Sequence, residues 1–322
     1  MQFAHLVSAL TLAVVVPMNA CAQEYPSKTI RFIVGYTAGG LTDIAGRLIA
    51  QELGERLNTS IVVENRDGAG GTIAATAVAR APKDGYTLLF AASPELAIFP
   101  AIKQNMPYDW RRDFATITLV GTTPLLLAVH PSVAATSAKE LVALAKEQPG
   151  KLNYASFGAG TSNHLATELF KAKSGTNIVH VPYKGAGAAM PDFLSARVQM
   201  VFHSEPQLLS LVKEGKVRVL AYAAAQRSAR LPQVPTMSEA GFPGFVVGSW
   251  VGVVGPAGIP VNIVNRLSRE IASVVDSAKV QKVFGEQGTI PAHTTPEGFT
   301  NFISRQITEL SELGKQAGIS LE

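Results

Sequence analysis

The chain has little cysteine and little charge. Cys21 is the only cysteine among 322 residues, so no disulfide can form within the chain and the fold depends on packing. Charged residues make up 16% of the sequence, and the net charge of +4 comes from scattered lysines and arginines, which argues against a nucleic-acid partner. Hydrophobic residues make up 47%. The chain is therefore globular, and its length favours two domains.

Long apolar runs are also missing after the N-terminus, and the one at the N-terminus has the pattern of a signal peptide. Residues 1–22 contain no Lys, Arg, Asp or Glu, and residues 6–16 form an apolar run too short to span a bilayer comfortably. Small residues at positions 20–22 suit cleavage after Ala22, although a basic residue is lacking at the start. We expect export to the periplasm with a cleaved leader. Lipid attachment at Cys21 is the alternative, and residues 18–20 suit it poorly.

From residue 24 onward, short apolar runs alternate with segments of helical period, which predicts an α/β fold with mostly parallel sheets. Residues 231–244 are rich in proline and glycine and are expected to cross between domains. Strands are expected over residues 29–35, 60–64, 86–92, 117–120, 125–129, 152–157, 177–181, 198–203 and 217–223. Helices are expected from about 43 to 57 and over 72–81, 137–147, 162–173, 186–196, 261–275 and 296–317.

Four glycine-rich loops each follow a predicted strand and precede a predicted helix: residues 35–43, 65–72, 157–162 and 183–187. Glycine lets the backbone approach a ligand, and the free N–H groups and positive dipole end of a helix N-terminus favour an anion. Ligands of parallel α/β sheets bind at the carboxyl ends of the strands. Turn geometry alone could explain any one loop, but two in each half of the chain together predict a carboxylate site.

Enzyme motifs are incomplete or missing. Residues 68–73 begin like a dinucleotide-binding fingerprint but end in Ile73, and no clear acid ends a strand about twenty residues later. Lys184 precedes Gly185 and does not occupy the position of a phosphate-binding lysine at a helix start. No Gly-x-Ser-x-Gly elbow occurs. The histidines beyond the leader are widely spaced, with no helical metal pair. We therefore expect neither catalysis nor a cofactor or metal.

Four single residues allow two interpretations each. His164, in the first turn of its predicted helix, could donate to a ligand or could be a surface or capping histidine. His203 ends an apolar strand and could reach the ligand or be an ordinary core histidine. Arg66 lies between two acids, which favours local charge pairing. Trp250 could stack on a ligand, but packing in the core or at a hinge is the expected role.

Several short motifs occur in order between residue 25 and about residue 319. They are Tyr25-Pro26-Ser27-Lys28, Gly39-Gly40-Leu41-Thr42-Asp43, Asn65-Arg66-Asp67-Gly68-Ala69-Gly70-Gly71, Pro107-Tyr108-Asp109, Gly160-Thr161-Ser162-Asn163-His164-Leu165, His180-Val181-Pro182-Tyr183-Lys184-Gly185, Val234-Pro235-Thr236, Glu239-Ala240-Gly241 and Gly255-Pro256-Ala257-Gly258. This ordered set resembles the Bug family, the substrate-binding proteins of tripartite tricarboxylate transporters.

The resemblance implies a two-domain Venus-flytrap fold of the periplasmic-binding-protein type, with two crossings between the domains. Domain 1 would combine residues 24–124 with 249–322, and domain 2 would be residues 125–248. The implied function is that of an extracytoplasmic receptor that binds a small carboxylate between its domains and delivers it to the membrane permease subunits of the transporter. We expect a monomer. A ligand sensor for a membrane receptor kinase, or an enzyme acting on a small organic acid, is the alternative.

The resemblance also implies that the ligand carboxylate is held mainly by backbone N–H groups and bridging waters in the first two loops. Two departures matter: many relatives have prolines where this chain has Gly35, Thr37 and Ala38, and many have an acid where His203 stands. The identity of the acid therefore stays open. The predicted ligand-binding residues are Tyr36, Thr37, Ala38, Gly39, Gly40, Asp43, Gly68, Ala69, Gly70, Gly71, Thr72, Ser93, Phe157, Gly158, Ala159, Gly160, Thr161, Lys184 and His203.

Overall fold

The computed structural model describes residues 25–158 and 160–317. The predicted signal peptide at residues 1–22, with Cys21, and the predicted ligand-binding residue Ala159 lie outside this part. Within it, no helix combines the length and the apolar character needed to cross a membrane.

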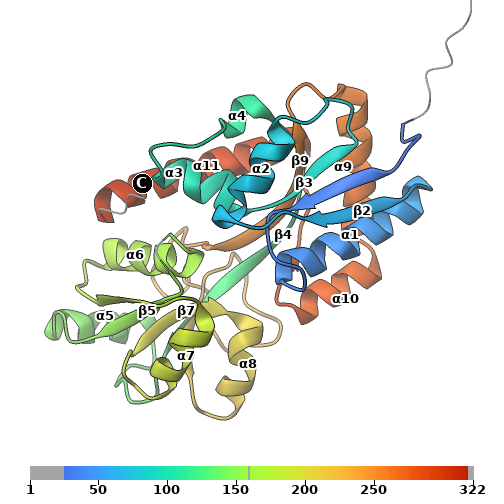
Figure 1. Ribbon diagram of the computed structural model, residues 1–322. Coiled ribbons are helices and arrows are strands. Elements are labelled where there is room, and N and C mark those ends of the chain that lie inside the picture. Colours follow the sequence, from blue (N-terminus) through green and yellow to red (C-terminus); the bar gives the residue numbers. More distant parts are fainter. Residues whose placement is uncertain (1–24, 159, 318–322) are drawn as a thin grey trace, which may run out of the picture.

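The described strands form one mixed sheet in the order β2-β1-β3-β9-β4-β7-β5-β6, with β10 and β8 also paired to β4 (Figure 1). Short β-branched and aromatic runs favour these strands. Their bounds are β1 Ile30–Val34, β2 Ile61–Asn65, β3 Thr87–Ala92, β4 Phe114–Val129, β5 Asn153–Ser156, β6 Val179–Pro182, β7 Met200–Ser204, β8 Arg218–Tyr222, β9 Gly248–Pro256 and β10 Ile290–Pro291.

Helices cover both faces of this sheet, and the molecule has two lobes (Figure 1). The first lobe holds β1, β2, β3, β9, β10 and the start of β4, with α1 Leu41–Leu57, η1 Ala69–Gly71, α2 Thr72–Ala79, η2 Pro94–Ile98, α3 Phe99–Ile102, α4 Trp110–Asp113, α9 Val261–Val275, α10 Ala278–Glu286 and α11 Pro296–Ala317. The second lobe holds the end of β4 and β5 to β8, with α5 Ala138–Glu147, α6 Ser162–Ser174, α7 Ala186–Leu194 and α8 Glu205–Lys213.

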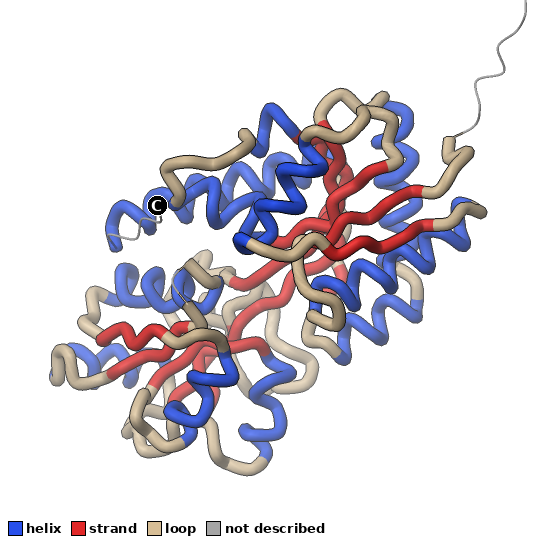
Figure 2. The backbone as a smooth tube through the Cα atoms, viewed as in Figure 1, coloured by secondary structure: helices blue, strands red, loops and turns tan. Residues whose placement is uncertain are grey.

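A single strand, β4, runs from the first lobe into the second (Figure 2). It pairs with β9 from Phe114 to Pro124 and with β7 from Leu125 to Val129. The prediction of two separate strands at 117–120 and 125–129 is therefore wrong, because the chain stays extended through residues 121–124. The sequence pattern also predicts no strand or helix where the structure has β9, α8 and α10. The other predicted strands and helices are confirmed to within a few residues.

The carboxyl ends of the strands in the two lobes face each other. Strands β3 and β4 are both antiparallel to β9, so β3 runs in the direction of β4, toward the second lobe. Strand β7 is antiparallel to β4 and runs back toward the first lobe. Because β1 and β2 are parallel with β3, and β5 and β6 with β7, all six strands end at the side where the lobes meet.

Each lobe has its own buried apolar clusters, one on each face of the sheet. In the first lobe, one cluster joins the sheet to α1, α9 and α10, and the other joins it to α2 and α11. The second lobe repeats this arrangement with α5 and α6 on one face and α7 and α8 on the other. A smaller cluster connects the lobes, because Ile98 and Leu313 of the first lobe pack with Leu165 of the second.

Candidate functional site

Loop 1, residues 35–40, follows β1 and is fixed by the buried carboxylate of Asp43. One carboxylate oxygen accepts hydrogen bonds from the Gly39 N–H at 2.9 Å and from Arg47 Nε at 3.0 Å. The other accepts from Asn65 Nδ2 at 2.7 Å, and the same amide donates to the Tyr36 carbonyl at 3.0 Å. Asp43 is 2% exposed. This member of the predicted site therefore holds the loop in shape, and its oxygens are already occupied.

Loop 2, residues 66–71, follows β2 and has a backbone that requires glycine. Gly68, Gly70 and Gly71 all have positive φ, as does Ala69 at 46°. A Cβ at Gly70 would run into the ring of Phe99, and a Cβ at Gly35 would lie 2.6 Å from the Cα of Gly71. Loops 1 and 2 therefore touch through their glycine backbones. Side chains would push them apart.

The helices that follow these loops begin without a side-chain cap. Gly40 is the N-cap of α1 and Gly71 is the N-cap of α2, and neither can supply a side-chain acceptor for the first N–H groups. A helix N-terminus with unpaired N–H groups carries a partial positive charge and favours an anion. The touching loops place two such termini in one region, at the carboxyl ends of β1 and β2.

Glu95 lies behind loops 1 and 2, and the sequence analysis misses it. Its side chain is fully buried, accepts a hydrogen bond from the Tyr36 hydroxyl at 2.6 Å and accepts another from the Ala92 N–H at 2.7 Å. A Cβ at Gly71 would lie 2.9 Å from this carboxylate. Burial raises the pKa of Glu95 to about 7, although the hydrogen bonds from Tyr36 and Ala92 oppose that rise.

Loop 3, residues 157–161, follows β5 in the second lobe and is held by side chains of α6. Asn163 Oδ1 accepts from the Phe157 N–H at 3.2 Å and from the Thr161 hydroxyl at 2.6 Å. His164 Nδ1 accepts from the Gly160 N–H at 3.1 Å. The Thr161 N-cap makes no side-chain capping bond, so α6 also begins uncapped. Of the two interpretations of His164, the structure supports the one in which it holds the start of the helix.

Three stacked rings, those of Tyr154, His180 and His164, support loop 3. His180 lies 4.8 Å from Tyr154 and 4.4 Å from His164, measured between ring centroids. His180 Nε2 is 2.6 Å from the Ser156 hydroxyl, which accepts from the Gly158 N–H at 3.4 Å. Burial, followed by the nearby His180, lowers the pKa of His164 to about 4. The histidines are therefore neutral near pH 7 and can accept the hydrogen bonds that loop 3 needs.

His203 lies at the end of β7, opposite Leu126 of β4 and close to the point where β4 changes lobes. Its Nδ1 accepts from the Ser204 N–H at 2.8 Å, so the neutral ring carries its proton on Nε2. Among the described residues Nε2 has no hydrogen-bond partner, and no side-chain polar atom there is both buried and unpaired. Burial lowers the pKa of His203 to about 4. Its Nε2–H is thus a neutral donor at the lobe junction.

The remaining candidates divide between structure and surface. Ser93 is buried and its hydroxyl lies 3.2 Å from that of Ser249 on β9. Lys184 is exposed. Arg66 pairs with Glu64 at 2.6 Å, as its neighbours predict. Trp250 is 1% exposed and donates to Gln306 on α11, which confirms packing in the core as its role.

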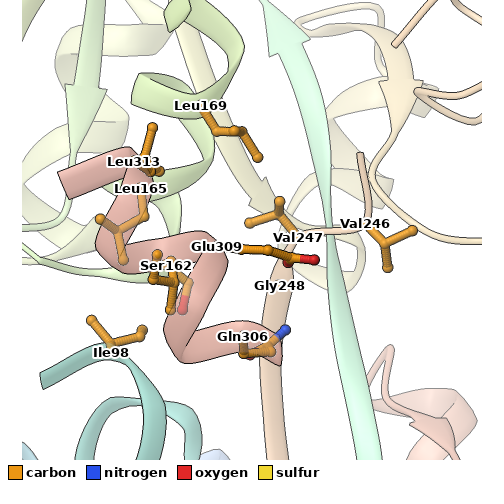
Figure 3. A pocket seen from close by; sticks show the side chains of 11 residues that line it. Ile98, Ser162, Leu165, Leu169, Val246, Val247, Gly248, Gln306, Glu309 and Leu313 are labelled. Atoms are coloured by element: carbon orange, nitrogen blue, oxygen red, sulfur yellow. The ribbon is translucent and has the colours of Figure 1, made fainter. Parts of the chain in front are cut away.

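A partly enclosed cavity lies beside this region, between α6 and α11 (Figure 3). Its walls are mostly apolar, with Leu165 and Leu169 from the second lobe and Leu310 and Leu313 from the first. None of the eighteen predicted ligand-binding residues that the structure describes lines it. Within residues 25–158 and 160–317, no group of three or more His, Cys, Asp or Glu side chains is arranged to hold a metal ion.

Three uncapped helix starts, two in one lobe and one in the other, together with strand ends that face each other, suit the capture of an anion between two lobes. The fold is that of a two-domain periplasmic solute-binding protein. The chain belongs to the tripartite tricarboxylate transporter receptor family (TctC), whose pattern it matches over residues 45–319.

Related proteins agree with this assignment. Protein BugT of Bordetella pertussis is 35% identical over 313 residues, which is 97% of this chain and 95% of BugT. An R. palustris protein solved with adipate is 34% identical, with a TM-score of 0.77 over 92% of this chain and 99% of that protein. MatC from Rhodopseudomonas palustris, solved with malate, is 28% identical, with a TM-score of 0.71 over 90% of this chain and 99% of MatC. The prediction of a Bug-type receptor is confirmed.

Proposed function

We propose that this receptor binds a small carboxylate between its lobes and delivers it to the membrane permease subunits of a tripartite tricarboxylate transporter. The main support is that the uncapped starts of α1, α2 and α6 all follow strands whose carboxyl ends face the opposite lobe. N–H groups at such positions are natural donors to a carboxylate. The adipate and malate in the R. palustris structures support the same chemical class.

In this proposal the carboxylate is bound chiefly by backbone N–H groups of loops 1 and 2, within residues 37–40 and 68–72. The N–H groups of Gly39, Gly40, Gly71 and Thr72 already donate within the protein, so the donors are those of the other residues in these two ranges. Loop 3 and the Nε2–H of His203 contact the ligand from the second lobe. Asp43, Ser93 and the Tyr36 hydroxyl stand behind this surface, since their polar atoms are already paired within the protein. Lys184, on the exposed loop after β6, contributes positive charge at the rim.

The two lobes would act as domains that close on the ligand. The boundaries at residues 124/125 and 248/249 fit this motion, because β4 exchanges β9 for β7 between Pro124 and Leu125. A ligand that contacts both lobes stabilises the closed form by the difference in its affinity for the two forms. Export with a cleaved leader belongs to the same proposal, and N-terminal sequencing of protein recovered from the periplasm tests it.

A thermal-shift screen of the mature protein against mono-, di- and tricarboxylates, aromatic acids and acidic amino acids tests the ligand class. An acid at 100 times its dissociation constant contributes about 2.7 kcal/mol of stability, which is a readily measured shift. If a sugar or a cation shifts the transition and no carboxylate does, the proposed ligand class is wrong.

Gly40→Val tests the first loop. The φ of −74° at Gly40 is open to other residues, so the substitution blocks the α1 N-terminus without a strained backbone, although its Cβ lies 3.3 Å from the Thr37 carbonyl oxygen. Gly285→Val is the matched control, because Gly285 lies on α10 with no atom near an added Cβ. We expect the Gly40 variant to lose at least tenfold in affinity and the control to bind normally. Equal affinity in both would remove loop 1 from the site.

A further inference from the structure

The carboxyl of Glu95 has no positively charged partner. Among the described residues, no lysine, arginine or histidine forms an ion pair with it, and its polar contacts are the Tyr36 hydroxyl, the Ala92 N–H and its own backbone N–H. Asp43, buried in the same lobe, has Arg47 at 3.0 Å. A buried carboxylate without a cation is costly and tends to take up a proton instead. The carboxyl of Glu95 can therefore gain or lose a proton near neutral pH.

The surroundings of Glu95 contain few other titratable groups. Tyr36 reaches it from loop 1, and Tyr108 donates its hydroxyl hydrogen bond to the Glu95 backbone carbonyl at 2.6 Å. Loop 2 lies against the carboxylate at Gly71, and its Gly70 carbonyl faces the Tyr36 hydroxyl. Helix α11 packs on η2 through apolar side chains such as Phe299 and Ile303. Tyr36 is the one titratable side chain among the causes that set its pKa, and burial followed by the nearby Glu95 raises the pKa of Tyr36 well above its usual value, so Glu95 is the group that titrates.

Tyr36 connects Glu95 to the proposed ligand loop. Its hydroxyl lies 2.6 Å from Glu95 Oε2 and 3.5 Å from the carbonyl oxygen of Gly70. When Glu95 is ionised, Tyr36 must donate to the carboxylate. When Glu95 is protonated, its own O–H can donate to the Tyr36 oxygen, and the Tyr36 proton is free to turn to the Gly70 carbonyl. Protonation of Glu95 would thus tie loop 2 to loop 1.

We propose that Glu95 takes up a proton from solvent when a carboxylate binds to loops 1 and 2, and that Tyr36 transmits this change to loop 2 at Gly70. The inference rests on the proposed function. The ligand anion would lie on the N–H groups of loops that contact Glu95 at Gly71, and Glu95 itself lies in a poorly screened interior where a nearby like charge repels it. Glu95 is a positioning residue in this scheme, because it acts through Tyr36 and Gly71 and does not touch the ligand.

The sign of the pH dependence follows from linkage. The bound form holds more protons than the free form, so affinity is highest when Glu95 is already protonated and falls as pH rises through about 7. Mono- and dicarboxylic acids are almost completely ionised above pH 6.5, so one of these is used, and His164 and His203 with pKa values of about 4 are neutral there. The window from pH 6.5 to 8.5 therefore isolates Glu95.

The experiment is titration calorimetry of the intact mature protein with adipate, malate or whichever acid of the screen binds best. Between pH 6.5 and 8.5 the dissociation constant should rise by about tenfold or more. At pH 8, the binding enthalpy measured in buffers of different ionisation enthalpy should show uptake of a large fraction of one proton. A flat affinity with no proton uptake overturns the inference while leaving the receptor function intact. Absence of binding by every acid would instead defeat the proposed function.

Three variants assign the effect to its residues. Glu95→Gln, a neutral mimic, should bind tightly with neither pH dependence nor proton uptake. Tyr36→Phe removes a hydrogen bond that favours ionised Glu95, so the fall in affinity should move to higher pH. Glu205→Gln is the matched control, since Glu205 is also a buried acid following a strand end but pairs with Arg230 at 3.2 Å. Wild-type proton uptake in Glu95→Gln would overturn the assignment. If that variant does not fold, the wild-type and Tyr36→Phe pH profiles still decide.

Discussion

Asp43 and Glu95 show how local partners decide the state of a buried acid. Both carboxyls are almost completely buried in the first lobe. Although burial acts to raise it, the pKa of Asp43 is held below its usual value by hydrogen bonds from Arg47, Gly39 and Asn65. Glu95 lacks a cation, and burial raises its pKa to about 7. One acid therefore fixes a loop as a permanent anion, and the other can change its charge near neutral pH.

This difference predicts the stability of Glu95→Gln. Glu95 has a higher pKa in the folded than in the unfolded chain. Its contribution to the free energy of unfolding is therefore fully present below about pH 4.5 and is lost as pH rises through 7. At pH 8 the glutamine variant should be more stable than the wild type by about 1 to 3 kcal/mol. Urea unfolding at pH 5 and pH 8 measures this. A variant less stable than the wild type at pH 8 contradicts it.

A second prediction concerns His203. If its Nε2–H donates to the ligand carboxylate, His203→Ala should weaken binding by about tenfold, the usual effect of losing a hydrogen bond to a charged group. Because the pKa of His203 is about 4, this loss should be the same at pH 6.5 and pH 8.5, unlike the effect of Glu95. His130→Ala is the control, because His130 follows the far end of β4 and its side chain bonds Ser132. Unchanged affinity in His203→Ala would place this ring outside the site.

At the residue scale, sequence reasoning finds the loops but misses the side chains behind them. Glycines after apolar strands point to Gly40 and Gly70 because backbone freedom and helix starts can be read from the sequence. Glu95 escapes because an acid in the first turn of a helix is normally solvated. Its burial depends on Tyr36 and Gly71, which reach it from loops 1 and 2.

At the level of elements, the sequence does not predict β9, one of the two crossing strands, and its glycines explain why. It contains Gly248, Gly252 and Gly255, and glycine lowers the strand signal of any sequence. In the structure these glycines meet close neighbours: a Cβ at Gly252 would run into the ring of Phe299, and one at Gly255 into Ile259. The residues that hide the strand are thus required by packing against α11 and the segment before α9, which local sequence does not reveal.

Gly252→Ala should therefore destabilise the first lobe. The added methyl group would overlap the Phe299 ring and lie 2.9 Å from the Thr118 carbonyl oxygen, and overpacking of a core costs about 1 to 3 kcal/mol. Gly285→Ala, in an open position on α10, should be neutral or slightly stabilising. Urea unfolding of both variants gives the comparison. Equal stability of the two variants would show that the packing around Gly252 can accept a methyl group, which would contradict this prediction.

For the whole molecule, the crossing of β4 and the neighbouring start of β9 decide how the lobes can move. Thr122, Thr123 and Pro124 resemble a loop in sequence, yet they continue β4 into the second lobe. Proline lacks an N–H donor and is tolerated here because β4 changes partner between Pro124 and Leu125. The two-domain order was predicted from a family resemblance. The continuous strand could not be predicted from the sequence, because pairing with distant strands is what keeps residues 122–124 extended.

Closure about these crossings should be visible in solution. Small-angle X-ray scattering of the mature protein should show a smaller radius of gyration with a saturating acid than without it, because the ligand stabilises the closed form. Gly40→Val should show no such change at the same acid concentration, whereas Gly285→Val should behave like the wild type. An unchanged radius in wild-type protein that demonstrably binds the acid would mean that capture does not involve lobe closure.

The central claim is that loops 1 and 2 hold a carboxylate on their backbone N–H groups between the lobes. A crystal structure of the mature protein with the best-binding acid tests it most directly. We expect one carboxylate within hydrogen-bond distance, directly or through water, of N–H groups at residues 37–40 and 68–72, with His203 Nε2 on the opposite side. An acid bound away from these loops, for example in the cavity between α6 and α11, would contradict the account.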